Sequence, residues 1–269
     1  MKKELAEFFE KKKIEYYSVL DYSVAREINH AIIERESFKP KSAIIFLLPY
    51  YAGEGKNLSA YAAARDYHIA IREHTRALIE ELQRLFPECR ARGYGDHSPI
   101  DERDAALSAG LGILGDSGLL INEKYGTYIF IADVLTDIPP EELGESGATK
   151  PHMRCISCGK CRSACPTGIL RGESGECLSA ITQRKGDLTE DEVDLMRKFN
   201  TVWGCDLCQS VCPYNKEPKI TPISFFLEDR ITTLTSERLS KMSKDEFAQR
   251  AFAWRGRKTV ERNLKLLDY

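Results

Sequence analysis

The stretch Cys155-Ile-Ser-Cys158-Gly-Lys-Cys161-Arg-Ser-Ala-Cys165-Pro166 decides how this sequence must fold. Three cysteines at three-residue spacing can hold three corners of a [4Fe-4S] cluster, and the fourth cysteine of such a run ligates a second cluster. A second motif, Cys205-Asp-Leu-Cys208-Gln-Ser-Val-Cys212-Pro213, follows later in the chain. Together the motifs predict a ferredoxin-like module with two [4Fe-4S] clusters.

The number of cysteines agrees with that prediction. Two clusters with four thiolate ligands each need eight cysteines, and the chain contains nine, of which the two motifs supply seven. Cys177 lies between the motifs and is the natural eighth ligand, which leaves only Cys89. We assign one cluster to Cys155, Cys158, Cys161 and Cys212. We assign the other cluster to Cys165, Cys177, Cys205 and Cys208.

Zinc and disulfide bonds are the alternative uses of so many cysteines. Structural zinc sites take two separated cysteine pairs around one ion, whereas a third cysteine at the same spacing followed by Cys-Pro is the ferredoxin arrangement. The number of cysteines is odd, and residues 1–13 are charged without the apolar core of a signal peptide. We therefore expect reduced cysteines and a cytoplasmic location.

The composition describes a globular protein of ordinary charge. The chain has 269 residues, of which 42% are hydrophobic and 30% charged, and its net charge is -2. The longest apolar run, residues 43–48, is far shorter than the roughly 20 residues that cross a bilayer, so we expect no membrane contact.

No global positive field attracts nucleic acid. The basic stretch at residues 250–265 is interpreted as a solvated helix, with a nucleic-acid contact as the alternative.

The region before the cluster module has alternating helix and strand signals. Periodicity predicts helices over residues 5–13, 24–36, 58–85 and 99–109, and strands over residues 16–20, 42–48 and 127–135. This pattern indicates an α/β or α+β fold. We expect three parts: a substrate and cofactor domain over residues 1–148, the cluster domain over residues 149–220 and a helical segment over residues 221–269, with residues 137–150 as the linker into the cluster domain.

Three segments of the N-terminal region carry candidate functional residues. Arg65-Asp-Tyr-His68 combines several polar groups, although His68 alone is more often an ordinary histidine. Asp96 precedes a predicted helix for which Ser98 is the better placed cap, which leaves Asp96 available for another role. The glycines between Gly110 and Gly118 would let the backbone approach a flat ligand. A dinucleotide site is disfavoured, because no strand precedes this GxGxxG string.

These segments, in this order and with this spacing, resemble the epoxyqueuosine reductase family. The resemblance rests on Arg65-Asp-Tyr-His68, on Asp96 with Pro99 and Arg103, on Gly110-Leu-Gly112 and Leu119-Leu-Ile-Asn122, and on the two cysteine motifs. Members of this family are cobalamin-dependent iron-sulfur enzymes, distantly similar to reductive dehalogenases. The similarity covers about residues 40–215 and continues more weakly through residues 247–264.

The resemblance implies a fold, a reaction and site residues. It implies a nitroreductase-like domain with base-off cobalamin beside one of the clusters, and reduction of the epoxide of epoxyqueuosine in a tRNA anticodon loop. Asp96 would donate the proton, and Arg103, Tyr67 and His68 would complete the catalytic site. Residues implied to bind the cofactor are Asp96, Gly112, Ser117, Gly118, Leu120 and Asn122. An external electron donor of the flavodoxin or ferredoxin type is implied as a partner.

The chain also departs from the family pattern. Ile113 stands where the family usually has tryptophan, and Asp116 stands where it usually has lysine. The helical repeats that help members to grip tRNA are absent after Tyr269. Two alternatives therefore stay open. One is a dehalogenase-like or corrinoid-reducing enzyme, and the other is a ferredoxin-type electron carrier without chemistry of its own.

Overall fold

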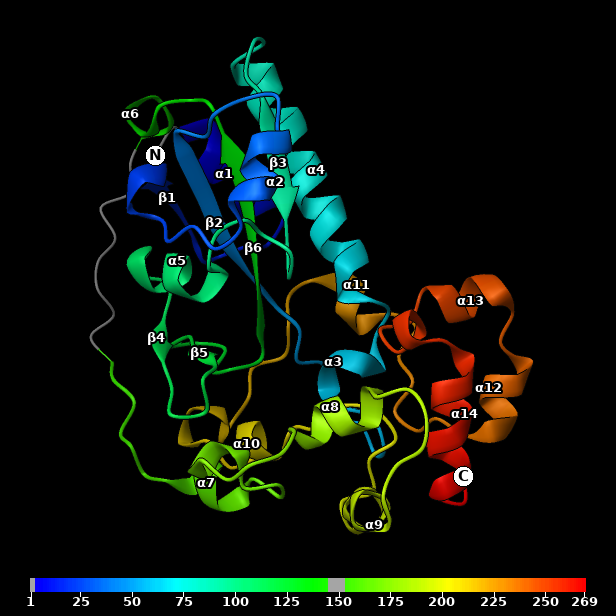
Figure 1. The fold of residues 1–269 in the computed structure, drawn as a ribbon. Helices are drawn as coiled ribbons and strands as arrows, with labels where there is room; N and C mark the ends of the chain where they lie inside the picture. The colour runs from blue at the N-terminus through cyan, green and yellow to red at the C-terminus, as the bar shows by residue number, and fades with distance from the viewer. Residues whose placement is uncertain (1–2, 145–152) are drawn as a thin grey trace. The chain divides into compact units, whose positions relative to one another are not determined.

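The computed structural model describes residues 3–144 and 153–269, which divide into two units. Unit 1 comprises Met1–Pro49 and Ala70–Ile156, and unit 2 comprises Tyr50–Ile69 and Ser157–Tyr269 (Figure 1). The domain boundary expected at residue 148 falls outside the described residues. The units also differ from the expected three parts, because residues 50–69 and 221–269 both belong with the cluster module.

Unit 1 is built on a four-stranded sheet with the order β1-β2-β6-β3. The strands are β1 (Tyr17–Asp21), β2 (Ser42–Pro49), β3 (Ala91–Tyr94) and β6 (Ile129–Thr136). Every neighbouring pair is antiparallel, so the fold is α+β and not the parallel α/β type. The two predicted apolar runs form β2 and β6, and every residue of β2 is buried. Such two-sided burial requires cover on both faces of the sheet.

Helices provide that cover. Ala105 and Ala106 of α5 (Glu102–Ser108) join the core cluster that contains Ile45 and Leu47 of β2. On the other face, Phe9 of α1 (Lys3–Lys11) contacts Phe46 at a ring-centroid distance of 5.9 Å. The unit also contains η1 (Tyr22–Val24), α2 (His30–Arg35), α6 (Pro140–Leu143) and the hairpin of β4 (Ile113–Leu114) and β5 (Leu120–Ile121). The α5 helix therefore packs on one face of the sheet, and the β4–β5 hairpin follows it in the chain.

The predicted helix over residues 58–85 is interrupted. It forms α3 (Ala60–Ala63) and α4 (Tyr67–Leu85), and α4 passes from unit 2 into unit 1 along the chain. Between them Arg65 forms an antiparallel bridge with Arg250, and the Asp66 N–H donates to the Gln249 carbonyl at 2.7 Å. The backbone therefore bonds to a distant segment where the periodicity predicts continuous helix.

The predicted helix over residues 24–36 is also shorter than expected and is reduced to α2. Before it, Glu27 bridges to Ile100, and the N–H groups of Ile28 and Asn29 donate to the Pro99 carbonyl. Strand β3 has only four residues and was not predicted. In both places long-range pairing, which periodicity does not report, sets the local structure.

Unit 2 is helical, and the larger of its two core clusters is shared by separate chain segments. The cluster module contains α7 (Lys160–Ala164), η2 (Ile169–Arg171), α8 (Leu178–Gln183), α9 (Glu190–Lys198), α10 (Leu207–Ser210) and η3 (Pro213–Asn215). The C-terminal part contains α11 (Ser224–Leu227), α12 (Ser236–Lys241), α13 (Lys244–Ala248), η4 (Ala253–Arg255) and α14 (Arg257–Leu266).

The C-terminal helices do not form a separate tail. Leu58, Trp203, Phe252 and Leu264 belong to one buried cluster, and Trp203 is fully buried. The Asn263 amide donates to the carbonyls of Thr182 and Val202 at 2.7 and 2.8 Å, as part of the same packing. Within the described residues, no helix is both long and apolar enough to cross a membrane.

Candidate functional site

The cysteines of the second predicted cluster gather in unit 2. The pKa of the Cys205 thiol is raised to about 11, chiefly by burial and in part by the charges of Cys177 and Cys165. Burial likewise raises the pKa of Cys208 to about 12, with added contributions from Cys205, Cys177 and Cys161. These effects place the sulfurs within electrostatic range of one another, although the described residues hold no group of three or more His, Cys, Asp or Glu side chains at metal-binding distance. Helix α7, which carries Cys161, packs against α10, which carries Cys208.

Cys165 has the surroundings of a cluster thiolate. Burial by itself raises its pKa, but hydrogen bonds from the backbone N–H groups of Leu170, Thr167 and Gly168 and from the Thr167 hydroxyl outweigh it and lower the pKa. Amide donors that converge on one sulfur stabilise its anionic form. The donor set of unit 2 therefore fits iron-sulfur ligation.

For the other cysteines, fewer contacts define the position of the sulfur atom. Cys155 lies at the end of unit 1, and Cys158 and Cys212 lie in unit 2. Cys89 also lies in unit 1, where burial and then the charge of Asp137 raise its pKa. The assignment of individual cysteines to the two clusters stays a prediction.

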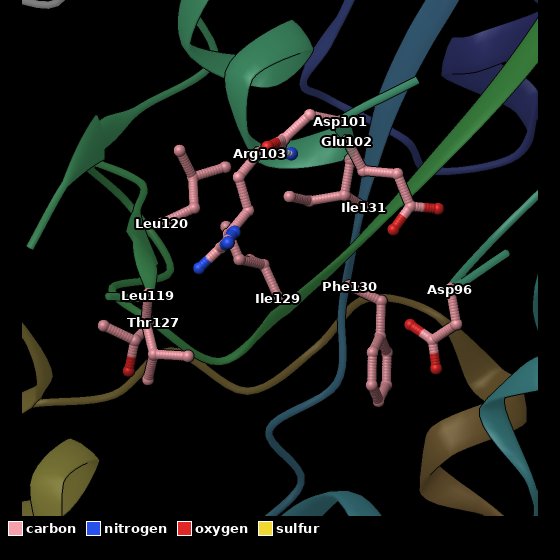
Figure 2. Close-up of a pocket in the computed structure, with 10 residues that line it drawn as sticks. All are labelled: Asp96, Asp101, Glu102, Arg103, Leu119, Leu120, Thr127, Ile129, Phe130 and Ile131. Atoms are coloured by element: carbon pink, nitrogen blue, oxygen red, sulfur yellow. Dashed lines mark hydrogen bonds between the residues drawn. The ribbon is translucent and has the colours of Figure 1, made fainter. Parts of the chain in front are cut away.

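A cavity of about 320 Å³ in unit 1 holds the predicted proton donor. One wall is apolar, and the rest carries ionisable groups. Figure 2 shows Asp96 beside Phe130, and Arg103 on the side of Leu119 and Thr127. The lining residues are Asp96, Asp101, Glu102, Arg103, Leu119, Leu120, Thr127, Ile129, Phe130 and Ile131. An acid at the edge of an apolar surface is an arrangement that can protonate a bound substrate.

Asp96 lies on the loop between β3 and α5 in an unusual backbone conformation. Its φ is 65°, in the left-handed region, and its side chain is exposed. The preceding residue is Gly95, where an added Cβ would come within 2.6 Å of the Ile71 side chain on α4. Ser98, predicted as the helix cap, has another role. The actual cap of α5 is Asp101, whose carboxylate accepts from the N–H groups of Arg103 and Asp104.

Two buried carboxyl groups behind Asp96 were missed by the sequence analysis. The pKa of Glu102 is raised to about 8, first by burial and then by the charges of Asp133 and Asp96, while a hydrogen bond from the Asp96 N–H acts in the opposite direction. Burial also raises the pKa of Asp133 to about 7, although a hydrogen bond from the Ser98 hydroxyl, at 3.1 Å, favours its charged form. The surroundings of both carboxyl groups therefore favour the protonated, uncharged form.

Arg103 is hydrogen-bonded to the neighbouring β4–β5 hairpin. Its guanidinium donates to the Gly118 carbonyl at 3.0 Å, in the turn between β4 and β5. Gly118 has a φ of 76°, and a Cβ there would make only an ordinary contact, 3.9 Å from Arg103 Nη1, whereas a Cβ on Gly112 would meet the Ile121 carbonyl oxygen at 2.6 Å. Gly112 is therefore required for the close approach of the two hairpin strands. Ser117 lies half-buried in the same turn.

Asn122 supports the same region from inside. It is almost fully buried, and its amide donates to the Leu111 carbonyl at 3.0 Å. Its side-chain oxygen accepts from the N–H groups of Lys124 and Tyr125. Leu120 is buried and contributes to the cavity wall. Of the hairpin residues predicted to contact the cofactor, Leu120 lines the cavity, whereas Gly112 and Asn122 stabilise the hairpin itself.

Tyr67 and His68 belong to unit 2, at the start of α4. Their rings stack at a centroid distance of 4.2 Å. The His68 Nδ1 lies 2.8 Å from Asp66 Oδ1, which also accepts from the His68 N–H at 3.0 Å. The Asp66 side chain therefore fixes the imidazole. The Arg65-Asp-Tyr-His68 motif is thus a locally ordered group that begins α4.

Comparison with known proteins supports both parts of the site. Residues 154–215 match the family model of a 4Fe-4S double cluster binding domain. Residues 34–97 match the family model described as Epoxyqueuosine reductase QueG, DUF1730. The second match ends just after Asp96.

Similar proteins extend over most of the chain. An epoxyqueuosine reductase from Listeria monocytogenes is 30% identical over 261 residues, which cover 87% of this chain and 67% of that protein. One from Leadbetterella byssophila is 31% identical over 226 residues, covering 78% of this chain and 72% of that protein. A solved epoxyqueuosine reductase with a tRNA-Tyr epoxyqueuosine-modified stem loop has a TM-score of 0.77 and 24% identity, covering 98% of this chain and 80% of that chain. This last likeness shows a shared fold.

These matches confirm the expected resemblance and the double [4Fe-4S] domain. They also confirm that the chain is an oxidoreductase with epoxyqueuosine reductase-like function. The electron-carrier alternative is thereby disfavoured. The chain belongs to the epoxyqueuosine reductase family.

Proposed function

We propose that this protein reduces the epoxide of epoxyqueuosine in a tRNA anticodon loop, with Asp96 as the proton donor. The observation that carries the proposal is the cavity in which Asp96 lies at the edge of an apolar wall. The reaction breaks both C–O bonds of the epoxide, forms a C=C bond and releases the oxygen as water. It therefore consumes two electrons and two protons per epoxide.

The electrons would arrive through the two clusters. The thiols of Cys165, Cys177, Cys205 and Cys208 would hold one cluster, in keeping with the mutual electrostatic effects in unit 2. Cys155, Cys158, Cys161 and Cys212 would hold the other cluster. An external donor of the flavodoxin or ferredoxin type would reduce them, because the chain's cysteine motifs carry electrons but do not generate them.

The apolar wall suits contact with a flat ring system. Leu120, Ile129 and Phe130 offer an aliphatic and aromatic surface, and the half-buried turn at Ser117 and Gly118 lies beside it. A corrin ring is larger than a cavity of about 320 Å³, so this wall would contact only part of it. When bound, base-off cobalamin supplies a low-valent cobalt as the electron donor to the substrate. Gly112 and Asn122 would act indirectly, by shaping the hairpin.

Asp96 would protonate the oxygen that leaves the epoxide. Its exposed carboxyl reaches the cavity from a loop that is fixed at Gly95 by the packing of Ile71. Arg103, which is held to Gly118, would orient a polar group of the substrate at the opposite side of the cavity. Tyr67 and His68 stay proposed as further catalytic residues, and Asp66 would hold the His68 imidazole in place for such a role.

The proposal is tested with anaerobically purified protein after reconstitution with iron, sulfide and cobalamin. The reaction with epoxyqueuosine-containing tRNA and a chemical reductant is followed by mass spectrometry of the nucleosides. We expect queuosine as the product. Asp96→Asn should lower the rate by about 10² to 10⁴, the usual contribution of general acid catalysis, whereas Asp104→Asn on α5 should not.

Two results would contradict the proposal. A reconstituted protein that binds cobalamin and both clusters but forms no queuosine would refute the substrate. Full activity of Asp96→Asn would refute the proton-donor role while leaving the substrate in place. Absorbance of bound cobalamin in each variant shows that lost activity is not lost cofactor.

A further inference from the structure

The proposed reaction poses a problem of proton supply. Loss of an epoxide oxygen as water places two protons on the same oxygen atom, and one carboxyl group holds at most one of them. We propose that Glu102 stores the second proton inside the cavity and passes it to Asp96 after Asp96 has given up its own. This inference rests on the proposed function and adds a positioning residue to it.

The proton moves in three steps that balance. The Asp96 carboxyl first gives its proton to the substrate oxygen and becomes a carboxylate. The Glu102 carboxyl then gives its proton to Asp96, which delivers it to the same oxygen as that oxygen leaves as water. Asp96 and Glu102 are then both carboxylates, and each takes up one proton from solvent before the next turnover, while the two electrons come from the clusters.

The geometry places Glu102 beside the loop that carries Asp96. Both residues line the same cavity, and in Figure 2 the Glu102 carboxyl is directed toward Asp96. The Asp96 backbone N–H hydrogen-bonds to the Glu102 carboxyl, and the charges of the two side chains interact. The other carboxyl oxygen, Oε1, is shielded from solvent and has no hydrogen-bond partner among the described residues. A proton on this group has Asp96 as its neighbour inside the cavity.

The charged groups around Glu102 are mainly acidic. Asp133 faces it from β6, Asp96 from the preceding loop and Asp101 from its own helix. Asp101 is paired with Arg26. The cation of the cavity, Arg103, donates its hydrogen bond to Gly118. Because negative neighbours and burial both disfavour a second negative charge, Glu102 keeps its proton at neutral pH.

A purely structural role explains this arrangement less well. Glutamine could accept the Asp96 N–H hydrogen bond with its carbonyl oxygen and would avoid the cost of holding an ionisable group in its neutral form. Asp133 lies behind Glu102 with its Oδ1 buried and without a partner among the described residues. The chain therefore keeps two protonatable groups next to a proton donor at a cost in stability, as expected when the proton itself is needed.

The first test needs no cofactor and no substrate. The protein is labelled with ¹³C at the glutamate carboxyl carbons and titrated by NMR. We expect one glutamate to titrate near pH 8, and this signal to be absent in Glu102→Gln. Its midpoint should move to lower pH in Asp96→Asn and in Asp133→Asn, since each variant removes a negative neighbour. A Glu102 that titrates in the ordinary glutamate range, or that does not respond to Asp96→Asn, overturns the proposal.

The second test uses single turnover of the reconstituted enzyme with epoxyqueuosine-containing tRNA. Glu102→Gln should slow queuosine formation about tenfold, less than the usual 10² to 10⁴ of direct proton transfer, because solvent can replace the lost donor. The loss of rate toward high pH that Glu102 ionisation causes in the wild type should vanish. Glu102→Asp should recover part of the rate, and Asp104→Asn should match the wild type.

The outcomes separate the two levels of the proposal. Glu102→Gln with the wild-type rate and pH profile overturns the proton reserve. An equal slowing at every pH, with the high-pH limb retained and no recovery in Glu102→Asp, overturns it also, because it indicates a structural role. If the wild-type enzyme forms no queuosine, the proposed function fails, and the NMR titration still decides whether Glu102 and Asp96 share their protons.

Discussion

The side chain of Asn57 and the backbone of Leu234 form a closed pair of hydrogen bonds across 177 residues of sequence. The Asn57 amide donates to the Leu234 carbonyl at 2.8 Å, and its side-chain oxygen accepts from the Leu234 N–H at 2.9 Å. Asn57 is only 2% exposed. This pair attaches the segment Tyr50–Ile69 to the C-terminal part of unit 2.

Substitution of Asn57 should therefore destabilise unit 2. Asn57→Ala leaves a buried N–H and a buried carbonyl of Leu234 without partners, which costs about 1–3 kcal/mol for each group. Urea unfolding of the anaerobically reconstituted protein should show a lower midpoint at an unchanged slope. Ser240→Ala, an exposed position in the same unit, is the control and should stay within about 0.5 kcal/mol. Equal stabilities of the two variants would show that the pair contributes little.

Loss of Cys177 should remove one cluster selectively. Cys177 precedes α8, and its charge affects both Cys205 and Cys208. We expect Cys177→Ala to bind about half of the roughly eight irons that two [4Fe-4S] clusters contain. Cys89→Ala should keep all of them, because the two motifs and Cys177 already supply the eight ligands of two clusters. Iron and sulfide analysis with electron paramagnetic resonance measures both, and a whole cluster lost from Cys89→Ala would reverse the ligand assignment.

Stability should fall as pH rises through the range in which Glu102 and Asp133 ionise. Their pKa values in the folded protein, about 8 and about 7, lie above their ordinary values of 4.5 and 3.8. At a pH between the ordinary and the raised pKa of each group, the native state binds more protons than the unfolded state. The free energy of unfolding therefore decreases as pH rises.

Glu102→Gln removes one of these two contributions. Its melting temperature should therefore exceed that of the wild type at pH 8 by about 2–4 °C for each kcal/mol gained. Differential scanning fluorimetry across pH measures this difference. Glu141→Gln, at an exposed position on α6, serves as the control and should follow the wild-type curve. If the melting temperatures of Glu102→Gln and the wild type differed by the same amount at every pH, the raised pKa of Glu102 would be contradicted.

The two hairpin glycines should respond differently to alanine. In Gly112→Ala the new Cβ would meet the Ile121 carbonyl oxygen at 2.6 Å, and a backbone atom cannot move aside cheaply. We expect a loss of about 1–3 kcal/mol from overpacking. Gly118→Ala places its Cβ in ordinary contact with Arg103 Nη1, at 3.9 Å, but has a left-handed φ of 76°, which costs roughly 1–2 kcal/mol.

A second substitution at Gly118 distinguishes these two causes. Gly118→Asn should recover part of the loss, because asparagine tolerates the left-handed region better than alanine. The corresponding Gly112→Asn should recover nothing, since its clash is steric. Thermal unfolding of the four variants makes the comparison, and recovery at position 112 would contradict the steric explanation.

The sequence predicted those parts of the fold that depend on local pattern. The cysteine motifs could be interpreted because a cluster demands a fixed spacing of ligands along the chain. Strands β2 and β6 were recognisable as apolar runs, which burial on a sheet requires. The break before Tyr67 was not recognisable, because it depends on pairing of Arg65 with Arg250, far along the chain. For the same reason residues 50–69 were placed in the wrong part of the molecule.

The site was predictable in the same uneven way. Asp96 was found because it precedes a helix at a spacing that the family shares. Glu102 has the sequence context of an ordinary acidic residue in the first turn of a helix, which is stabilising in solvent. Asp133 has the context of a polar residue in an alternating strand, yet it is fully buried. Their burial comes from tertiary packing, and no neighbouring residue in the sequence signals it.

The interleaved arrangement of the two units along the chain has a consequence for biosynthesis. Residues 50–69 leave the ribosome early, but the partners that bury them, such as Leu234 and Phe252, are made near the end of synthesis. Unit 1 can close once residue 156 has emerged, whereas unit 2 waits for α14. Iron-sulfur assembly factors should therefore meet the cysteine motifs on a chain whose N-terminal sheet is already folded.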